Sequence, residues 1–393
     1  MVTLQTAENA LKTVYLGVVS DQLNINANPL LSKIKHSNAD VWGKEIRKLA
    51  PFGINGGIGA GTEDGALPKA SGNKYVQFVS TLKNLYGTIE ISDKAIRASE
   101  NNSGAFVNLL NAEMEGLIKA STFNLSRMLY GDGKGILTKD YTGGTTDTDF
   151  ITVKKGLNNF MEGMVIEFYD VDGECYEVAN SPLVVTSIER DTGKVHFNKK
   201  LKSNLNPSNE YPVVQHSFDM EITGLGKIFS NDDLYGVSRA TNAWMKPYIK
   251  TAAGEINDIV IQQAIDSLEE NSGSIVDFIT CSSAVKRAYQ TYLNSFKRNV
   301  DVLELKGGYK AISYNGIPLV SDRFINNDEM YLLNTKEFTL HELCDWQWLE
   351  GDDGKIIRQI PNHPTYSATL VKYADLICDK PSGQAKISGI AVS

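Results

Sequence analysis

The sequence predicts an α+β fold that combines two or three modules. The chain has 393 residues, and one compact domain usually contains about 100–200. A long helical pattern from Ser103 to Tyr130 stands between a glycine-rich segment and a block of short strand-like runs at residues 146–217. The C-terminal part mixes helical and strand-like runs, which favours the α+β class over an all-helical or all-strand fold.

Composition and charge restrict the possible functions. Hydrophobic residues make up 42% and charged residues 22% of the chain, as in ordinary folded proteins. The 39 basic and 47 acidic side chains give a net charge of −8, whereas tight, sequence-independent DNA binding normally goes with the opposite sign. Non-specific contact with nucleic acid through a local inner face stays compatible with this balance.

The cysteines and the chain start carry no chemical signature. The cysteines lie far apart, without a CxxC pattern, which argues against a zinc site and against a disulfide-stapled domain. We predict four reduced, mostly buried thiols: Cys175, Cys281, Cys344 and Cys378. No run approaches the roughly 18 apolar residues of a membrane span, and Met1–Ala10 does not resemble a signal peptide. We therefore expect no membrane contact and synthesis in the cytosol.

The N-terminal segment has a helical pattern. Its apolar residues recur at helical spacing from Ala7 to Val18, and Thr6 is a suitable N-cap. The pattern breaks at Asn24–Pro29, after which Leu30, Leu31 and Ile34 offer apolar anchors. This pattern fits a helix packed on its own domain and an arm that reaches another subunit equally well.

A glycine-rich segment follows at residues 50–73 and cannot pack a core of its own. Two strand-like runs, Tyr75–Leu82 and Tyr86–Ile91, come next and are joined by Lys83–Leu85. Together they predict a long, flexible excursion that contains a β-hairpin. Loops over 20 residues long are unusual in compact domains and tend to be functional.

The longest helix is expected from Ser103 to about Tyr130, because apolar residues hold one face and three glycines follow. Its length would be roughly 40 Å, enough for a strut. In the block at residues 146–217, we predict short strands separated by the turn pairs Asp172-Gly173 and Thr192-Gly193, which is typical of a small β-barrel or sandwich.

The C-terminal part alternates between helix and strand. Helical spacing marks residues 256–268 and 285–296, with a buried strand at Ile275–Thr280 between them. Asn315-Gly316 lies between two strand-like runs and is the strongest two-residue hairpin signal. Further strands are expected at Met330–Leu333, Phe338–Leu343, Lys355–Ile360 and Tyr366–Cys378.

Motifs for catalysis or cofactor binding are not found. The glycines at positions 56–61 lack the Lys-Ser/Thr of a phosphate loop and the strand and helix of a dinucleotide site. The segment 236–240 resembles a nucleophile elbow around Ser238 but lacks the final glycine, and His341 or His363 as its partner would be a guess.

The remaining candidates also have simpler explanations. Asp170–Glu174 has the glycine at the wrong position for a calcium loop and strands rather than helices on both sides, so we predict a β-turn there, and another at Asp352–Gly354. Trp346 and Trp348 share one face of a strand, which core packing explains. We therefore predict no catalytic, cofactor-binding or metal-binding residue, no enzymatic activity and an assembly role.

The order of these elements resembles the capsid subunit of tailed bacteriophages with the Hong Kong 97 fold. The segment Gly56–Ala60 with Leu67-Pro68 is similar to the entry of that family's E-loop. Leu85–Ser92 with Ala98-Ser99 is similar to the strand that runs back to its spine helix, and Leu129–Gly135 to the segment after that helix. Tyr314–Asp322 resembles a recurrent hairpin of its axial domain.

The resemblance implies a division of the chain and a set of contact residues. The expected parts are an N-terminal arm (1–50), the E-loop and its strands (51–100), the spine helix and P-domain (101–145), a β-rich insertion domain (146–217), an A-domain (218–360) and C-terminal strands that return to the P- and A-domains (361–393). Intersubunit contacts are implied for the E-loop residues Gly56, Gly57, Gly59, Lys69, Lys74, Tyr75, Lys83, Asn84 and Tyr86 and for the arm residues Leu30, Leu31 and Ile34. The lysine–asparagine cross-link of the type member is not carried over, because the sequence does not match any of these lysines to an asparagine.

The function that the resemblance implies is that of a major capsid protein without cofactors. Hexamers and pentamers of the chain would form an icosahedral shell around packaged double-stranded DNA, in virions assembled in the cytoplasm of a host bacterium. The chain starts almost at the arm, so a separate scaffolding protein is expected, beside a portal protein and a decoration protein as further partners. Shortening residues 54–84 to a tight turn should leave a soluble subunit that cannot form stable shells.

Three alternatives stay open at this point. An encapsulin, a bacterial cargo compartment, would have the same fold. A glycan-binding surface protein would explain the β-rich block and the paired tryptophans, although no signal peptide supports it. A hydrolase that uses Ser238 comes third.

Overall fold

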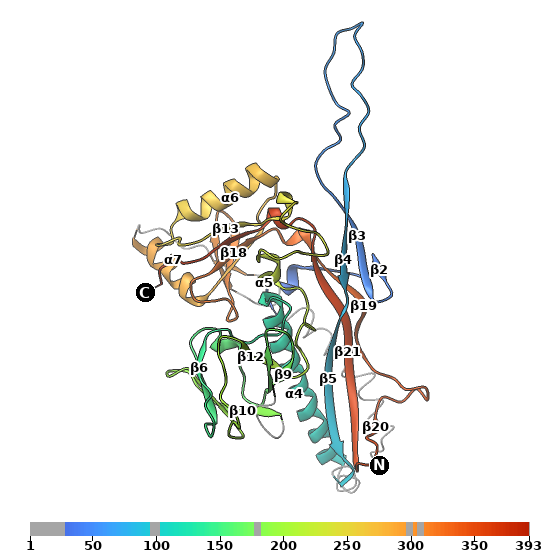
Figure 1. The fold of residues 1–393 in the computed structure, drawn as a ribbon, viewed down its shortest axis with the longest axis vertical. Coiled ribbons are helices and arrows are strands. Elements are labelled where there is room, and N and C mark those ends of the chain that lie inside the picture. Colours follow the sequence, from blue (N-terminus) through green and yellow to red (C-terminus); the bar gives the residue numbers. More distant parts are fainter. Residues whose placement is uncertain (1–27, 95–102, 177–181, 296–301, 305–309, 393) are drawn as a thin grey trace.

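One long helix and four sheets determine the shape of the described chain (Figure 1). The structure, a computed structural model, describes residues 28–94, 103–176, 182–295, 302–304 and 310–392. The helix predicted near residues 7–18 lies outside the described residues. The helices are α4 (Ser103–Tyr130), α5 (Leu225–Ile228), α6 (Asp258–Ser272) and α7 (Ser283–Ser295), and the short 3-10 helices are η2 (Leu31–Lys33), η3 (Leu157–Asn159), η4 (Ala243–Met245), η5 (Thr335–Glu337) and η6 (Pro381–Gly383).

A five-stranded sheet lies along α4. It consists of β1 (Lys35–Ser37), β19 (Phe338–Trp348), β21 (Thr365–Cys378) and β20 (Arg358–Gln359), with β5 (Lys83–Ser92) paired to β21. Alternate residues of β5 are buried, and at Gly87 the strand comes so close to the helix that a Cβ atom would lie 2.6 Å from Leu117 Cδ1. The predicted bounds of the long helix, Ser103 and Tyr130, are confirmed.

A small sheet of β2 (Val41–Trp42), β3 (Glu45–Pro51) and β4 (Tyr75–Thr81) carries the glycine-rich segment as the loop between β3 and β4. The prediction that Tyr75–Leu82 and Tyr86–Ile91 would form the hairpin is wrong. Strand β4 pairs with β3, whereas β5 pairs with β21. The two runs follow each other through Leu82 without a turn. Each run pairs with a different strand, so neither pairs with the other.

The β-rich block and the strand before it form a seven-stranded sheet with a separate core cluster, to which Phe123 of α4 also contributes. Its strands are β6 (Tyr141–Gly143), β7 (Phe150–Val153), β8 (Val165–Asp170), β9 (Cys175–Tyr176), β10 (Leu183–Glu189), β11 (Lys194–Phe197) and β12 (Glu210–Val214). Phe160, Phe168 and Val195 are fully buried in this core. A bridge between Ile136 and Val213 brings the two ends of the block together.

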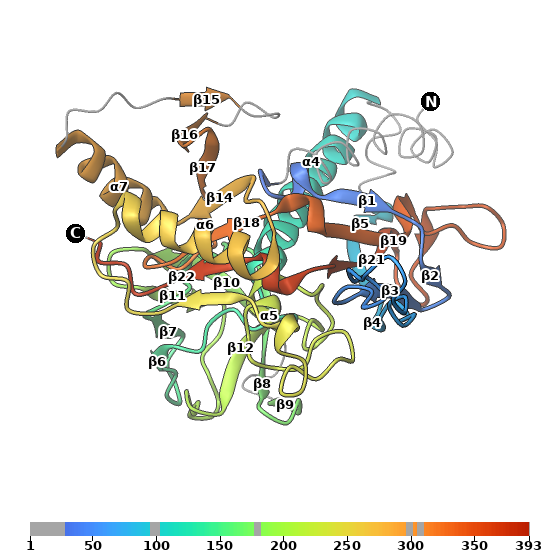
Figure 2. The ribbon, with the colours of Figure 1, turned by 90° about the horizontal axis from the view of Figure 1, so that it is seen from above.

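Most of residues 248–333, together with the C-terminal strand, build an α/β module (Figure 2). Its sheet has the order β13-β22-β18-β14-β17-β16-β15, and α6 and α7 pack against it. Asn315 and Gly316 have φ values of 49° and 80°, which confirms the predicted hairpin because both central residues of a type I′ turn need positive φ. The strands are β13 (Tyr248–Lys250), β14 (Phe278–Cys281), β15 (Val302–Glu304), β16 (Lys310–Tyr314), β17 (Ile317–Ser321), β18 (Met330–Leu333) and β22 (Ala385–Ile387).

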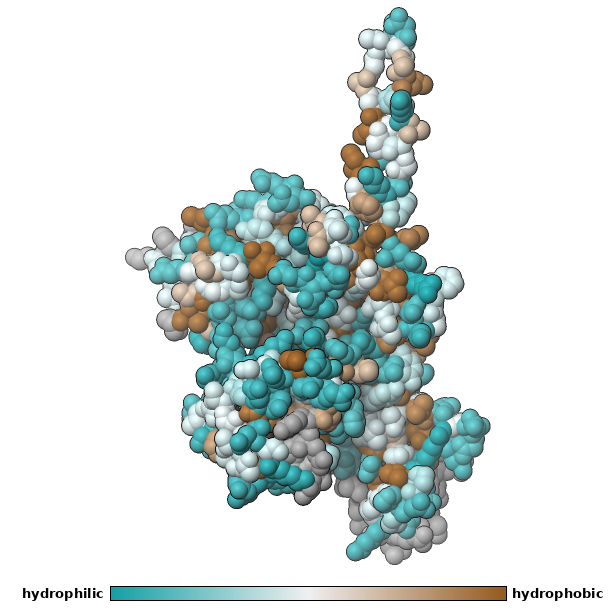
Figure 3. Space-filling model, in the orientation of Figure 1, coloured by the Kyte–Doolittle hydropathy of each residue, from teal (hydrophilic) through white to brown (hydrophobic). Residues whose placement is uncertain are grey.

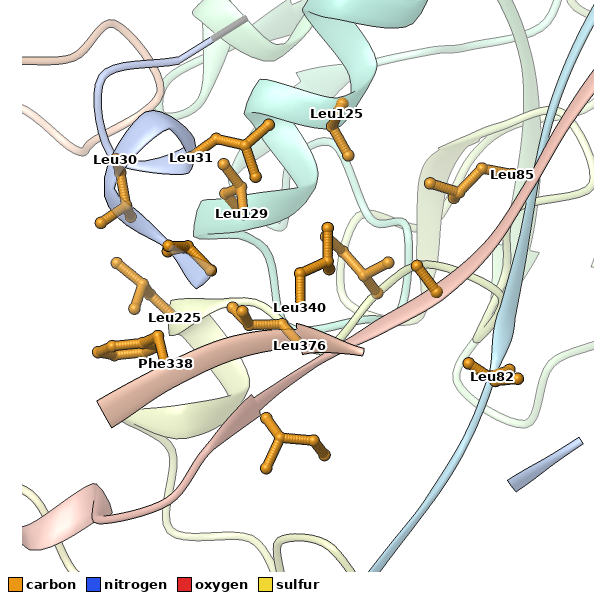
Figure 4. Packing of buried hydrophobic residues seen from close by; sticks show 14 of the residues in the cluster. Leu30, Leu31, Leu82, Leu85, Leu125, Leu129, Leu225, Phe338, Leu340 and Leu376 are labelled. Carbon is orange, nitrogen blue, oxygen red and sulfur yellow. The ribbon is translucent and has the colours of Figure 1, made fainter. Parts of the chain in front are cut away.

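The largest core cluster connects the long helix with the five-stranded sheet (Figure 4). Leu129 of α4 and Phe338 of β19 belong to it, and so do Leu30 and Leu31 of the segment before β1. Trp346 and Trp348 are also buried in this cluster, so the packing explanation of the paired tryptophans is confirmed.

Candidate assembly surface

The hairpin of β3, β4 and their connecting loop projects away from the rest of the molecule (Figure 1). We call residues 45–81 the extension, residues 53–73 its tip, and residues 45–52 and 74–81 its root. Inside the tip, Asn55 Oδ1 accepts a hydrogen bond from Gly57 N, and Thr62 O accepts one from Gly65 N. The two limbs of the loop run close together, since a Cβ atom at Gly57 would lie 3.2 Å from Ser71 N.

Large aliphatic side chains on the tip face solvent. Ile54, Ile58 and Leu67 are 79%, 78% and 88% exposed, and Figure 3 shows apolar residues spaced along the extension. Full burial of such a side chain contributes about 1.5–3 kcal/mol, a gain that the chain does not obtain by itself. These side chains therefore make the tip a candidate contact surface for another molecule.

The root is anchored by aromatic packing. Phe52 stacks on Trp244 with ring centroids 5.1 Å apart, and the buried Phe78 lies between Trp244 and Tyr235. Tyr235 in turn holds β21: its hydroxyl donates to Leu376 O (3.0 Å) and accepts from Cys378 N (2.9 Å). The direction of the extension is thus set by contacts with residues 235–244 and β21.

Polar contacts fix the root as well. Lys48 Nζ lies 2.8 Å from Asp379 Oδ1, and Ser80 Oγ donates to Asp375 Oδ2 at 2.5 Å. Asp375 also accepts from Thr223 N (2.6 Å). Burial raises the pKa of the Asp375 carboxyl group, while these hydrogen bonds act in the opposite direction. The same carboxylate therefore binds the root, the segment after the β-rich block and the long sheet.

The predicted E-loop residues fall into two groups. Gly56, Gly57, Gly59, Lys69, Lys74 and Tyr75 lie on the extension. Lys83, Asn84 and Tyr86 lie on β5 in the body of the molecule. Lys83 Nζ donates to Asp219 O at 2.6 Å, and Tyr86 packs edge-on against Tyr373.

The predicted arm contacts have another role in this structure. Leu30, Leu31 and Ile34 are buried in the chain's own largest core cluster (Figure 4). In this conformation at most 5% of each of these three residues is exposed to another subunit. Nearby, Asn28 Nδ2 donates to Asp322 Oδ2 at 2.5 Å, which adds a polar anchor to the apolar ones.

Two further surface features were not predicted. Trp42 and Leu49 on the small sheet are 70% and 65% exposed. On the long sheet, a groove of about 660 Å³ is lined by residues 347–350, Ile356, Val371 and Tyr373. The groove depends on the pairing of β19 with β21, so no local sequence signal marks it.

The candidates for chemistry form turns and core contacts. Asp170 Oδ1 accepts from Asp172 N and Glu174 N, which confirms the β-turn. The second predicted turn, Asp352–Gly354, is also present, since Gly354 N donates to Gly351 O. Cys281 and Cys378 are buried, Cys344 is half-buried and Cys175 is exposed, and none of these four is in a disulfide bond.

The segment around Ser238 is a turn held by its neighbour Arg239, whose buried guanidinium donates to Ile228 O and Ser230 O. His341 Nδ1 lies 2.9 Å from Ala39 O, and burial lowers the pKa of this histidine. The described residues contain no group of three or more His, Cys, Asp or Glu side chains that could hold a metal ion. No helix among them is long and apolar enough to cross a membrane.

Comparison with known proteins relates the fold to virus shells. No family model matches the chain, and no curated protein matches its sequence. Among solved structures, the capsid of cyanophage A-1(L) matches 93% of this chain and 94% of its own subunit, with a TM-score of 0.56 and 14% identity. The described chain therefore has the fold of this phage capsid subunit.

Two further similarities have lower TM-scores. The procapsid of satellite phage P4 matches 96% of this chain and 99% of its own chain, with a TM-score of 0.45 and 10% identity. An encapsulin from Synechococcus elongatus matches 82% of this chain and 79% of its own chain, with a TM-score of 0.44 and 9% identity.

Proposed function

We propose that the chain is the major capsid protein of a tailed bacteriophage, which assembles as hexamers and pentamers into an icosahedral shell around double-stranded DNA. The observation that carries the proposal is the extension: a capsid-type fold projects aliphatic side chains of the tip into solvent from a firmly packed root. Exposed apolar side chains on a firmly packed base suit a chain that contacts many copies of itself. The fold it shares with the cyanophage A-1(L) capsid subunit supports the same reading.

In this proposal the extension acts as the E-loop. The isolated tip has few internal hydrogen bonds, so ordering it costs conformational entropy that only a neighbouring subunit can offset. Contacts of the tip involve Lys69 beside the aliphatic side chains, and Lys74 and Tyr75 contribute from the adjoining root. Asn84 and Tyr86 contribute through the exposed face of β5, and Lys83 through the start of that strand. Each contact is modest, but a closed shell multiplies them.

The other parts take the roles that the resemblance implies. Helix α4 acts as the spine, the long sheet as the core of the P-domain, the α/β module as the A-domain and the β-rich block as an insertion domain. A scaffolding protein, a portal protein and a decoration protein are partners in this proposal, and DNA is enclosed through non-specific contacts. The chain then resides in the virion, after synthesis in the host cytoplasm.

The test is electron microscopy of the purified chain, combined with sedimentation velocity on the same sample. We expect closed shells, or hexamers and pentamers, alone or with the scaffolding protein encoded beside it. Shells that close without a scaffold around one specific enzyme would favour an encapsulin instead. A chain that stays monomeric even with its scaffold would contradict the proposal.

A further inference from the structure

A cleft of about 690 Å³ lies where the β-rich block meets the α/β module. Three segments line it: residues 152–159 after β7, the β10–β11 turn at 190–193, and the connection from β17 to β18 at 323–328. We call it the basic cleft. It lies outside the extension and has no part in the assembly contacts proposed above.

The cleft has the opposite charge sign to the chain as a whole. Lys154, Lys155, Arg190 and Arg323 line it, against the two acidic residues Asp191 and Asp328, in a chain with a net charge of −8. In the described part of the chain, Lys154, Lys155 and Arg190 form no ion pair. These three cations and Arg323, gathered in one cleft without a carboxylate partner among the described residues, favour an anionic ligand.

The walls of the cleft are fixed by hydrogen bonds. Lys154 N donates to Asp140 O (2.9 Å) and Val153 N donates to Gly193 O (2.8 Å), so the strand end and the turn hold each other. Asn158 Nδ2 donates to Arg323 O at 3.0 Å and ties the block to the 323–328 segment. The site is therefore preorganised, so that ligand binding costs little conformational entropy of the protein.

The orientation of Arg323 and the neighbouring amides adds specificity. The Arg323 guanidinium lies over the rings of Phe123 (5.2 Å) and Phe324 (5.5 Å), and this packing restricts the side chain. The N–H groups of the guanidinium stay available to a carboxylate. The exposed side chains of Asn326 and Asn327 offer amide donors and acceptors, the groups that pair with a peptide backbone.

We infer that the basic cleft binds an acidic peptide segment of a partner protein, with the cations on its carboxylates and the asparagines on its backbone. A nucleic acid fits less well, because its binding depends mainly on neutralised phosphates and the four cations of this cleft stand beside the two carboxylates of Asp191 and Asp328.

The test is a binding titration on the full-length, unassembled chain. A fluorescein-labelled eight-residue peptide of alternating Glu and Gly is followed by fluorescence anisotropy, with the Gln/Gly peptide as the uncharged control. The variant K154E/K155E should weaken binding at least about tenfold, because two attractions become repulsions. The matched variant K199E/K200E makes the same charge change on the same block outside the cleft and should alter binding by less than about twofold.

Several outcomes would overturn the inference: no binding of the acidic peptide, equal binding of the Gln/Gly peptide, or equal losses in both variants. Tighter binding of a labelled eight-nucleotide oligothymidine than of the peptide would assign the cleft to nucleic acid instead. Thermal unfolding of each variant verifies that it folds. Because the assay needs no shell, its failure is distinguishable from a failure of the proposed capsid function.

Discussion

The extension and the β-rich block differ in the burial of their apolar side chains. The block turns Phe160, Phe168 and Val195 into a core of its own, whereas the extension tip leaves Ile54 and Ile58 in solvent. A segment that buries its own apolar residues can fold without help. A segment that exposes them gains stability only from another molecule, so the difference separates a self-sufficient module from a surface made for contact.

The largest effect is expected from removing the tip. Replacing Ile54–Gly72 by a short Gly-Asn turn should leave a folded, soluble chain, because every residue removed is exposed or half-buried. Shell formation should be lost completely, as seen by electron microscopy and sedimentation velocity. Normal shells from this variant would show that the tip is no contact surface.

A milder change distinguishes apolar contact from loop length. The variant I54S/I58S should reduce the yield of shells, since each aliphatic side chain that would be buried contributes about 1.5–3 kcal/mol. V171S/M220S alters two exposed apolar residues of the block and its border and serves as the matched control. Equal yields from both variants would contradict a special role of the tip.

Within the extension, the root should behave as core and the tip as surface. Phe78→Ala should destabilise the chain by about 4 kcal/mol, because a fully buried aromatic ring is lost between Trp244 and Tyr235. Leu67→Ala should change stability by less than about 0.5 kcal/mol. Urea unfolding of the unassembled chain measures both, and similar values would break the distinction between root and tip.

The block should unfold as a unit that its own core controls. Ile151→Ala, at a fully buried position, should cost about 3 kcal/mol and lower the unfolding temperature of the block by roughly 10–20 °C. Calorimetry should show this shift while the transition of the rest changes little. One joint transition that moves as a whole would mean that the block is not an independent module.

The smallest effect is expected in the pH dependence of stability, through His341 in β19 of the long sheet. Burial lowers the pKa of His341, so the unfolded chain binds the proton more readily than the folded one. Its contribution to stability is present above the unfolded value of about pH 6.5 and is lost as the pH falls from there through the folded-state pKa. His341→Gln should remove this part of the slope of unfolding temperature between pH 7.5 and 5, and an unchanged slope would contradict it.

Local signals predicted local structure well. The glycines after Tyr130 end the long helix where expected, the strand Met330–Leu333 has the predicted bounds, and Asn315-Gly316 makes the expected turn. Each of these features depends on residues close in sequence, where helical spacing, turn chemistry and positive φ act directly.

Pairing over long distances could not be predicted in the same way. Tyr75–Leu82 has the same alternation whether it pairs with β3 or with β5, so the sequence alone put the hairpin in the wrong place. The truncation expected for residues 54–84 would also remove Phe78 and Leu82, which are buried in the main core. Folding should therefore tolerate the removal of the tip but not of the whole range. Leu30 and Leu31 are apolar anchors in either setting, and only the fold assigns them to the chain's own core.

The uninterrupted passage from β4 into β5 has a mechanical consequence. Residue pairs from Lys83↔Ala374 to Ser92↔Thr365 join β5 to β21 in one long antiparallel ladder, and β5 continues the line of the extension (Figure 1). A neighbour that pulls on the tip along this line therefore loads the ladder in shear, so that its hydrogen bonds resist together rather than opening one after another. Tension from internal pressure would then spread over the long sheet and the helix behind it instead of peeling the extension away.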